Sequence, residues 1–211
     1  MLFAILTASI LGIEACKDKE SPTVCTPDNT FYIPSELSDR FYFKDSSYWI
    51  YRDSLTGQLD SFWVDKSERK VVSMDKQNYN SKGRCFEVGA YLLNTKLNGT
   101  YTVNIIPYPT SITESYKIYS LKIYYGNFFY QTLILDDSSY RNDEKEYGWV
   151  DTLQQIDIVG ITYNDVLRKS NVGAVYPDMF YISYYVRNKG LVKFVRYDKS
   201  VWELIRYKVY K

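Results

Sequence analysis

The sequence predicts a mainly β protein, built as a single antiparallel meander that forms a curved sheet or half-barrel with little helix. Apolar and polar residues alternate over segments of strand length, and short turn sequences separate these segments. The chain also holds 23 tyrosines, a residue that suits strands with one packed face and one wet face. A β-sandwich is the alternative architecture.

The first pair of strands is the stretch FYFKDSSYWIYRDSLTGQLDSFWVD, which we take as the opening hairpin of the sheet. We expect one strand at Tyr48–Arg52 and another at Gln58–Lys66, joined by a turn at Ser54–Gly57. The second strand is expected to continue as Lys70–Met74 after a break at Ser67 and Glu68. Before the hairpin, Ser35 and Glu36 allow a turn of helix.

The middle of the chain predicts two further hairpins. Strands at Arg84–Leu93 and Thr100–Ile106 flank Asn98 and Gly99, a pair that tolerates the positive φ of a tight turn. Ser115–Tyr125 and Phe128–Leu135 form the hairpin with the most regular alternation.

The last third of the chain predicts four or five more strands. Trp149–Ile161 indicates one or two short strands, whereas Thr162–Ser170 has apolar residues at helical spacing and its type stays open. Strands follow at Phe180–Val186, Gly190–Tyr197 and Val201–Tyr210, with polar turns between them. We expect the first and last hairpins to share one core.

Composition excludes several classes of function. The chain has 26 Lys and Arg against 25 Asp and Glu, and this near-zero balance argues against nucleic-acid binding. The chain has no histidine, which removes His-based general-base catalysis, Ser–His and Cys–His nucleophile pairs and His-based zinc sites. We therefore expect a non-enzymatic protein without a cofactor.

Residues 2–13, LFAILTASILGI, form an apolar run of signal-peptide length that is short for a membrane-spanning helix. The run leads into Ile13-Glu14-Ala15-Cys16, which resembles the lipobox of bacterial lipoproteins, although Glu14 stands where that motif has a small uncharged residue. An ordinary cleaved signal or a short buried segment is the alternative.

The lipobox resemblance implies that Cys16 is lipidated and anchors the protein to a membrane without a spanning helix. It divides the chain into a signal peptide (1–15), a lipidated tether (16–29) and an antiparallel β domain (30–211). The tether composition, SPTVCTPDNT at its end, suits an extended linker. The implied location is the cell envelope, as an outer-membrane lipoprotein that faces the periplasm or the cell surface.

Segments of the domain also resemble small lipoproteins of the Bacteroidetes type. The shared features are the opening strand with Trp49 and Tyr51, the segment Thr162–Leu167, and closing strands at Gly190–Lys193 and Trp202–Leu204. The resemblance implies a curved antiparallel sheet like the half-barrel of lipoprotein carriers, and it implies no catalytic residues.

Two cysteines remain if Cys16 carries lipid. In an oxidising compartment Cys25 and Cys85 can form a disulfide that clips the tether to the sheet. Closing a loop of about 60 residues contributes roughly 4 kcal/mol in the chain-entropy model. The sequence does not place the two Cα atoms, so two free thiols remain the alternative.

No metal site is expected. The two cysteines match no common ligand spacing. One acidic loop offers oxygen ligands for Ca²⁺ but lacks the spacing and the glycine of an EF-hand, and a solvated loop is the preferred interpretation. Its carboxylates are Asp136, Asp137, Asp143, Glu144 and Glu146.

The candidate ligand-binding residues are Trp49, Trp63, Trp149 and Trp202. On a concave face they could bind a glycan, a lipid or a peptide, and the alternative is that they pack in the core. Glu87 and Asp157 are candidates for half of a glycosidase carboxylate pair, but nothing in the sequence places them face to face.

Two functional hypotheses follow. The first is a non-enzymatic envelope lipoprotein that binds an apolar or peptide ligand, or a protein partner. The second is a glycan-binding or glycan-processing accessory protein that combines an aromatic platform with carboxylates. An open groove of Trp and Tyr rings beside two carboxylates favours the second hypothesis, whereas a filled concavity favours a scaffold.

Overall fold

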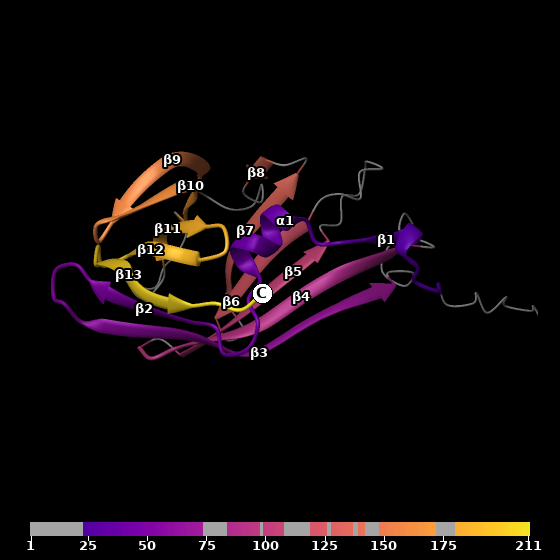
Figure 1. Ribbon diagram of the computed structural model, residues 1–211, viewed down its shortest axis with the longest axis horizontal. Helices are drawn as coiled ribbons and strands as arrows, with labels where there is room; N and C mark the ends of the chain where they lie inside the picture. The colour runs from indigo at the N-terminus through magenta and orange to yellow at the C-terminus, as the bar shows by residue number, and fades with distance from the viewer. Residues whose placement is uncertain are drawn as a thin grey trace, which may run out of the picture.

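The computed structural model describes residues 23–73, 84–97, 99–107, 119–125, 128–136, 139–141, 148–171 and 180–211. Within these ranges the chain forms one curled sheet with a single α-helix, α1 (Ser35–Phe41), over its concave side (Figure 1). The predicted fold class, mainly β with an antiparallel sheet curved into a half-barrel, is confirmed. No helix in the described ranges is long and apolar enough to cross a membrane.

Thirteen strands are present in the described part of the chain. They are β1 (Thr30–Phe31), β2 (Tyr48–Asp53), β3 (Leu59–Ser73), β4 (Cys85–Thr95), β5 (Gly99–Pro107), β6 (Tyr119–Tyr125), β7 (Phe128–Asp136), β8 (Ser139–Arg141), β9 (Val150–Ile158), β10 (Ile161–Ser170), β11 (Phe180–Val186), β12 (Gly190–Arg196) and β13 (Val201–Lys208). Their order across the sheet is β8-β7-β6-β5-β4-β3-β2-β13-β12-β11-β10-β9. Strand β1 lies off this order and pairs with β4. Within the order, neighbours follow the chain everywhere except between β2 and β13, so two meanders meet where these two strands pair.

The junction of β2 and β13 places the first and last hairpins in one core, as expected. Trp49 lies opposite Tyr207 and Tyr51 lies opposite Leu204. The Tyr51 ring packs against Phe62 of β3 and Phe194 of β12, with ring centroids 4.8 and 5.1 Å apart. Such aromatic pairs add roughly 0.5–1.5 kcal/mol each beyond the area they bury. The pair of Tyr51 with Phe194 connects the two meanders.

Most strands lie close to their predicted positions, but β3 is one uninterrupted strand. The break expected at Ser67 and Glu68 is absent, because β4 supplies a pairing partner at both residues. The ladder instead shifts register after Val64, where an irregularity or bulge absorbs the local strain. The expected loop after β7 contains β8, and most of that loop lies outside the described residues.

The segment Thr162–Ser170, whose type the sequence left open, belongs to strand β10. Within it Asp165 has a φ of 52°, in the left-handed region. This conformation interrupts the alternation of the strand, so Tyr163 and Val166 are both buried although they lie three residues apart. The helical spacing in the sequence thus marks a distorted strand.

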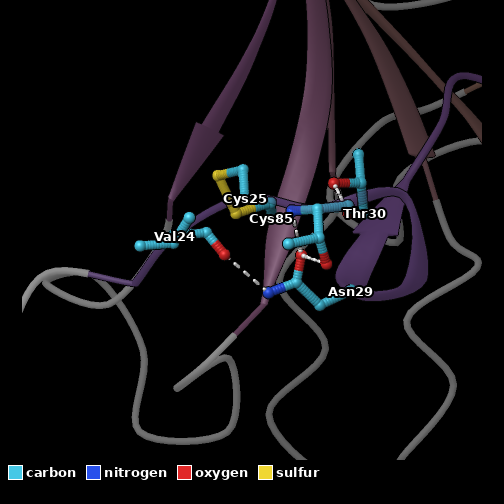
Figure 2. The surroundings of a disulfide bond; sticks show 6 residues. Val24, Cys25, Asn29, Thr30 and Cys85 are labelled. Atoms are coloured by element: carbon cyan, nitrogen blue, oxygen red, sulfur yellow. Dashed lines mark hydrogen bonds between the residues drawn. A yellow bond between two sulfur atoms is a disulfide. The ribbon is translucent and has the colours of Figure 1, made fainter.

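The segment that precedes the helix is fixed to the sheet at its start (Figure 2). Cys25 and Cys85 form a disulfide with their Cα atoms 5.6 Å apart. The Asn29 side chain accepts a hydrogen bond from the Thr26 N–H at 2.7 Å and donates one to the Val24 carbonyl at 3.0 Å. Strand β1 then pairs in parallel with the first two residues of β4, beyond the point where β5 ends its pairing. The candidate lipidation site, Cys16, lies outside the described residues.

A second attachment lies further along the same segment, at Glu87 of β4. Its carboxylate accepts the Ile33 N–H at 3.0 Å and forms a two-pronged ion pair with Arg69 of β3, at 2.6 and 2.8 Å. Burial acts to raise the pKa of Glu87, but the hydrogen bonds from Arg69 and the Ile33 N–H together hold that pKa below its ordinary value of 4.5.

We predict that the disulfide contributes about 2–4 kcal/mol to the free energy of unfolding, because it closes a long loop in the unfolded chain. The double variant Cys25→Ser, Cys85→Ala should lose that amount in urea denaturation. Reductant should lower the wild-type free energy of unfolding to the same level and leave the double variant unchanged. A wild type whose stability is insensitive to reductant in the unfolding experiment contradicts the prediction.

We also predict that Glu87 makes stability depend on acid. A carboxyl group whose pKa is lowered on folding stabilises the protein above its unfolded pKa, and this stability is lost as the pH falls through the folded pKa. Glu87→Gln should therefore be less stable than wild type at about pH 6, and the gap should narrow toward about pH 3. Urea unfolding at several pH values measures this gap, and a constant gap contradicts the assignment.

Candidate functional site

Helix α1 covers the concave face of the sheet and builds one wall of the candidate site. Leu37, Arg40 and Phe41 lie on one side of the helix at spacings of three and four residues, and all three are buried. Phe41 contacts Tyr185 of β11 with ring centroids 4.8 Å apart. The helix begins directly after Pro34 and ends at Tyr42, which returns to extended backbone. It is therefore a short element whose position depends on its contacts with the sheet.

Arg40 joins the helix to β10 and β11. Its side chain is 3 % exposed, and its guanidinium donates to the Asp165 carboxylate at 2.6 Å, the Asp165 carbonyl at 2.8 Å and the Tyr185 carbonyl at 3.1 Å. The remaining donor, Nε, is buried and has no hydrogen-bond partner. A buried arginine with an unused N–H is uncommon, because an unsatisfied buried donor costs about 1–3 kcal/mol.

Asp165 owes its position to its left-handed backbone. Asp tolerates this region better than most residues, which explains why a carboxylate can occupy a point where β10 departs from regular extension. Besides Arg40, the Asp165 carboxylate accepts a hydrogen bond from Arg187 at 3.0 Å, and Arg187 approaches Glu36 of the helix at 3.9 Å. Two cations and two anions thus lie together along one side of the helix.

Lys211 binds the C-terminal end of helix α1. Its ammonium donates to the carbonyls of Ser38, Asp39 and Tyr42 at 2.8–3.0 Å and lies 3.8 Å from the centre of the Phe43 ring. A cation at the carbonyl end of a helix offsets the partial negative charge there. Burial lowers the pKa of Lys211 to about 8, so the ammonium form still prevails at neutral pH.

A cavity lies between α1 and the concave face of the sheet. The cavity volume is about 50 Å³. Besides Arg40 it is lined mostly by aromatic residues, among them Trp49, Tyr51, Tyr91 and Tyr185. Aliphatic residues lie among them, because Val103 of β5 pairs with Tyr91 and Leu93 of β4 pairs with Tyr101.

The tyrosines near Arg40 remain neutral at physiological pH. Burial raises the pKa of Tyr185 to about 12 and raises the pKa of Tyr51 and Tyr91 above their ordinary value of 10.0. The Tyr51 hydroxyl is one such neutral phenol, and it donates a hydrogen bond to the Leu191 carbonyl at 2.7 Å. Neutral phenols with raised pKa values are hydrogen-bond donors and poor general bases.

The four candidate tryptophans do not come together, so the predicted aromatic platform is not formed. Trp49 is the member that lines the cavity, and its Nε1 donates to the Lys189 carbonyl at 2.5 Å. Trp202 is buried and stacks on Phe194 at 5.9 Å. Trp63 is 39 % exposed on the other face of β3, because strand alternation puts its neighbours Phe62 and Val64 inside.

Trp149 lies apart from the other three, next to strand β9. It is 40 % exposed, and the Arg168 guanidinium covers its ring at 4.5 Å from the ring centre. This cation–π contact, together with the ion pair between Arg168 and Asp151, already occupies the face of the indole.

The candidate carboxylates are also separate. Glu87 is engaged by Arg69, whereas Asp157 on β9 accepts a hydrogen bond from the Thr162 hydroxyl at 2.5 Å. Six strands lie between β4 and β9 in the sheet order. Among the described residues no group of three or more Asp, Glu, Cys or His side chains is arranged to hold a metal ion. The predicted acidic loop, from Asp137 onward, contributes no described carboxylate.

Sequence reasoning missed Arg40, Asp165 and the cavity tyrosines. Arg40 is one of 26 basic residues and lies in a lead-in without a marked pattern. Its contacts come from residues 125 and 145 positions away, and no local signal reveals such a pairing. The one usable signal was the irregular spacing around Asp165.

No protein-family model, curated protein or solved structure matches the chain.

We predict that the contact between Arg40 and Asp165 stabilises the helix on the sheet. Asp165→Ala should lower the free energy of unfolding by about 1–3 kcal/mol, less than for a fully buried pair because the Asp165 side chain is 52 % exposed. Asp165→Asn should cost less, since Asn keeps an acceptor and tolerates positive φ. Urea denaturation measures both.

Arg187→Gln is the matched control for this prediction. Arg187 bonds to the same carboxylate but is 41 % exposed, so its removal should cost less than about 1 kcal/mol. A cost for Arg187→Gln equal to or greater than that for Asp165→Ala means that burial of Arg40 is not the reason for the stabilisation.

Proposed function

We propose that this chain is a non-enzymatic binding protein of the cell envelope, and that its concave face binds an apolar ligand. The observation that carries the proposal is the cavity beneath α1, whose lining is aromatic and aliphatic apart from Arg40. Ligand sites are typically concave and mostly apolar, with a few polar groups that fix orientation. The described residues offer this combination at the cavity.

The size of the cavity limits how a ligand sits. A cavity of about 50 Å³ holds only a small end group of a ligand, because drug-sized pockets measure roughly 300–1,000 Å³. The remainder of an extended ligand lies outside the cavity. We therefore propose a ligand that inserts one end and leaves the rest partly exposed.

The envelope location rests on two supports. The disulfide between Cys25 and Cys85 suits an oxidising compartment outside the cytosol. The leader that ends at Cys16 resembles a lipobox, and lipid there would anchor the domain to the membrane surface. Both observations fit an exported protein that meets apolar molecules at a membrane.

The glycan hypothesis gains no support from the geometry. It needs an exposed aromatic platform beside paired carboxylates. The exposed tryptophans lie apart, Trp63 on β3 and Trp149 just before β9, and Glu87 is paired with Arg69. The apolar-ligand proposal is therefore preferred.

We predict that a brominated acyl ester quenches the fluorescence of Trp49 in a saturable manner. Bromine quenches tryptophan on contact, and Trp49 lines the cavity whereas Trp63 lies on the opposite face of the sheet. Titration of the folded protein should show saturation for wild type and Trp63→Phe, and should lose it for Trp49→Phe. Equal quenching of all three proteins, or quenching that never saturates, rules out binding at this cavity.

A further inference from the structure

Tyr91 lies on β4 in the middle of the apolar lining of the cavity. It pairs with Val103 of β5, which in turn pairs with Ile123 of β6, and all three residues line the cavity. Its ring meets the Phe43 ring edge-on, with ring centroids 6.4 Å apart. Tyr91 is 8 % exposed, so its hydroxyl is a polar group placed among hydrocarbon and aromatic side chains.

The Tyr91 hydroxyl makes no hydrogen bond with any residue that the structure describes. Two other unpaired side-chain atoms in the described residues are completely enclosed, the Nε atoms of Arg40 and Arg196, and the Tyr91 hydroxyl is not among them. It is therefore an unpaired group that can be reached from the cavity. Burial, and to a smaller extent the neighbouring Tyr185, raises the pKa of Tyr91, so the hydroxyl keeps its proton.

Neighbouring polar groups of the lining already have partners. The Tyr51 hydroxyl donates to the Leu191 carbonyl at 2.7 Å, and the Tyr185 hydroxyl has the Ser183 side chain as its partner. A water molecule in the cavity would gain Tyr91 as a partner but few others, whereas a buried water commonly makes about three hydrogen bonds. A ligand with a single polar atom therefore suits this cavity better than water does.

We propose that Tyr91 is the specificity-determining residue of the cavity, and that its hydroxyl binds one hydroxyl or carbonyl oxygen at the inserted end of an otherwise aliphatic molecule. This inference rests on the proposed function, because it names the recognition group and the ligand class of the same site. A phenol hydroxyl both donates and accepts, so either kind of oxygen satisfies it. A fully aliphatic end would leave the hydroxyl unpaired, which is unfavourable in a buried place.

The volume of the cavity determines the probe. About 50 Å³ admits a short end group, so a long-chain primary alcohol, which ends in a single hydroxymethyl group, is the simplest molecule of the proposed class. The alkane of the same chain is the matched probe without the oxygen. Both carry bromine on the chain, so that quenching of tryptophan fluorescence reports binding next to Trp49.

The binding test compares wild type with two variants that each lose one buried hydroxyl. Tyr91→Phe should reduce the preference for the alcohol over the alkane about three- to tenfold, which is the net worth of one hydrogen bond. Tyr119→Phe is the matched control, because Tyr119 does not line the cavity and its hydroxyl donates to the Phe31 carbonyl at 2.7 Å. This control should leave the preference unchanged. Circular dichroism confirms that each variant is folded.

A second measurement needs no ligand. Removal of an unpaired buried hydroxyl should leave the urea midpoint of Tyr91→Phe equal to that of wild type or higher. Tyr119→Phe takes a donor away from the Phe31 carbonyl and should have a lower midpoint. A fall for Tyr91→Phe as large as that for Tyr119→Phe overturns the inference, because the Tyr91 hydroxyl would then have a partner within the protein.

The binding outcomes separate the inference from the proposed function. Saturable binding with the same alcohol preference in wild type and Tyr91→Phe overturns the inference and leaves the proposed function standing. An equal loss of preference in Tyr91→Phe and Tyr119→Phe also overturns it, since the effect would not belong to the cavity. Failure of both probes to quench wild type saturably overturns the proposed function together with the inference.

Discussion

The buried guanidinium of Arg40 is the constraint around which the concave side is arranged. A charge in this position must be compensated, and the compensation comes from Asp165 and from the Tyr185 carbonyl, both on strands far from the helix in sequence. These bonds fix α1 over the sheet, and Lys211 binds the carbonyls at the C-terminal end of the same helix. Without these contacts the sheet could still curl, but the helix would have no defined position over it and the cavity would lose one wall.

The burial of Arg40 also shapes the wall of the cavity. Compensation of Arg40 is complete in charge but incomplete in hydrogen bonds, since one N–H remains. The helix and the sheet together enclose a cavity that is lined mostly by aromatic residues. The wall that the helix provides thus depends on the contact between a seven-residue helix and a distorted strand.

Local patterns in the sequence were sufficient for the strands and insufficient for the site. Alternation located β2, because its residues alternate between buried and more accessible positions. It left the type of β10 open, because the left-handed Asp165 places Tyr163 and Val166 on the buried side together. The tryptophans do not form a platform, because the position of a residue along a strand decides which face of the sheet its side chain lies on, as Trp63 shows. The sequence also does not reveal how distant strands curve toward each other.

The pairing of β2 with β13 has a consequence for how the fold is reached. Each of the two meanders can form from neighbouring hairpins, but their union requires strands from opposite ends of the described domain. Pairings of such long sequence separation are entropically costly and slow to form. The core around Tyr51 is therefore expected to close late, after the last strand has been synthesised.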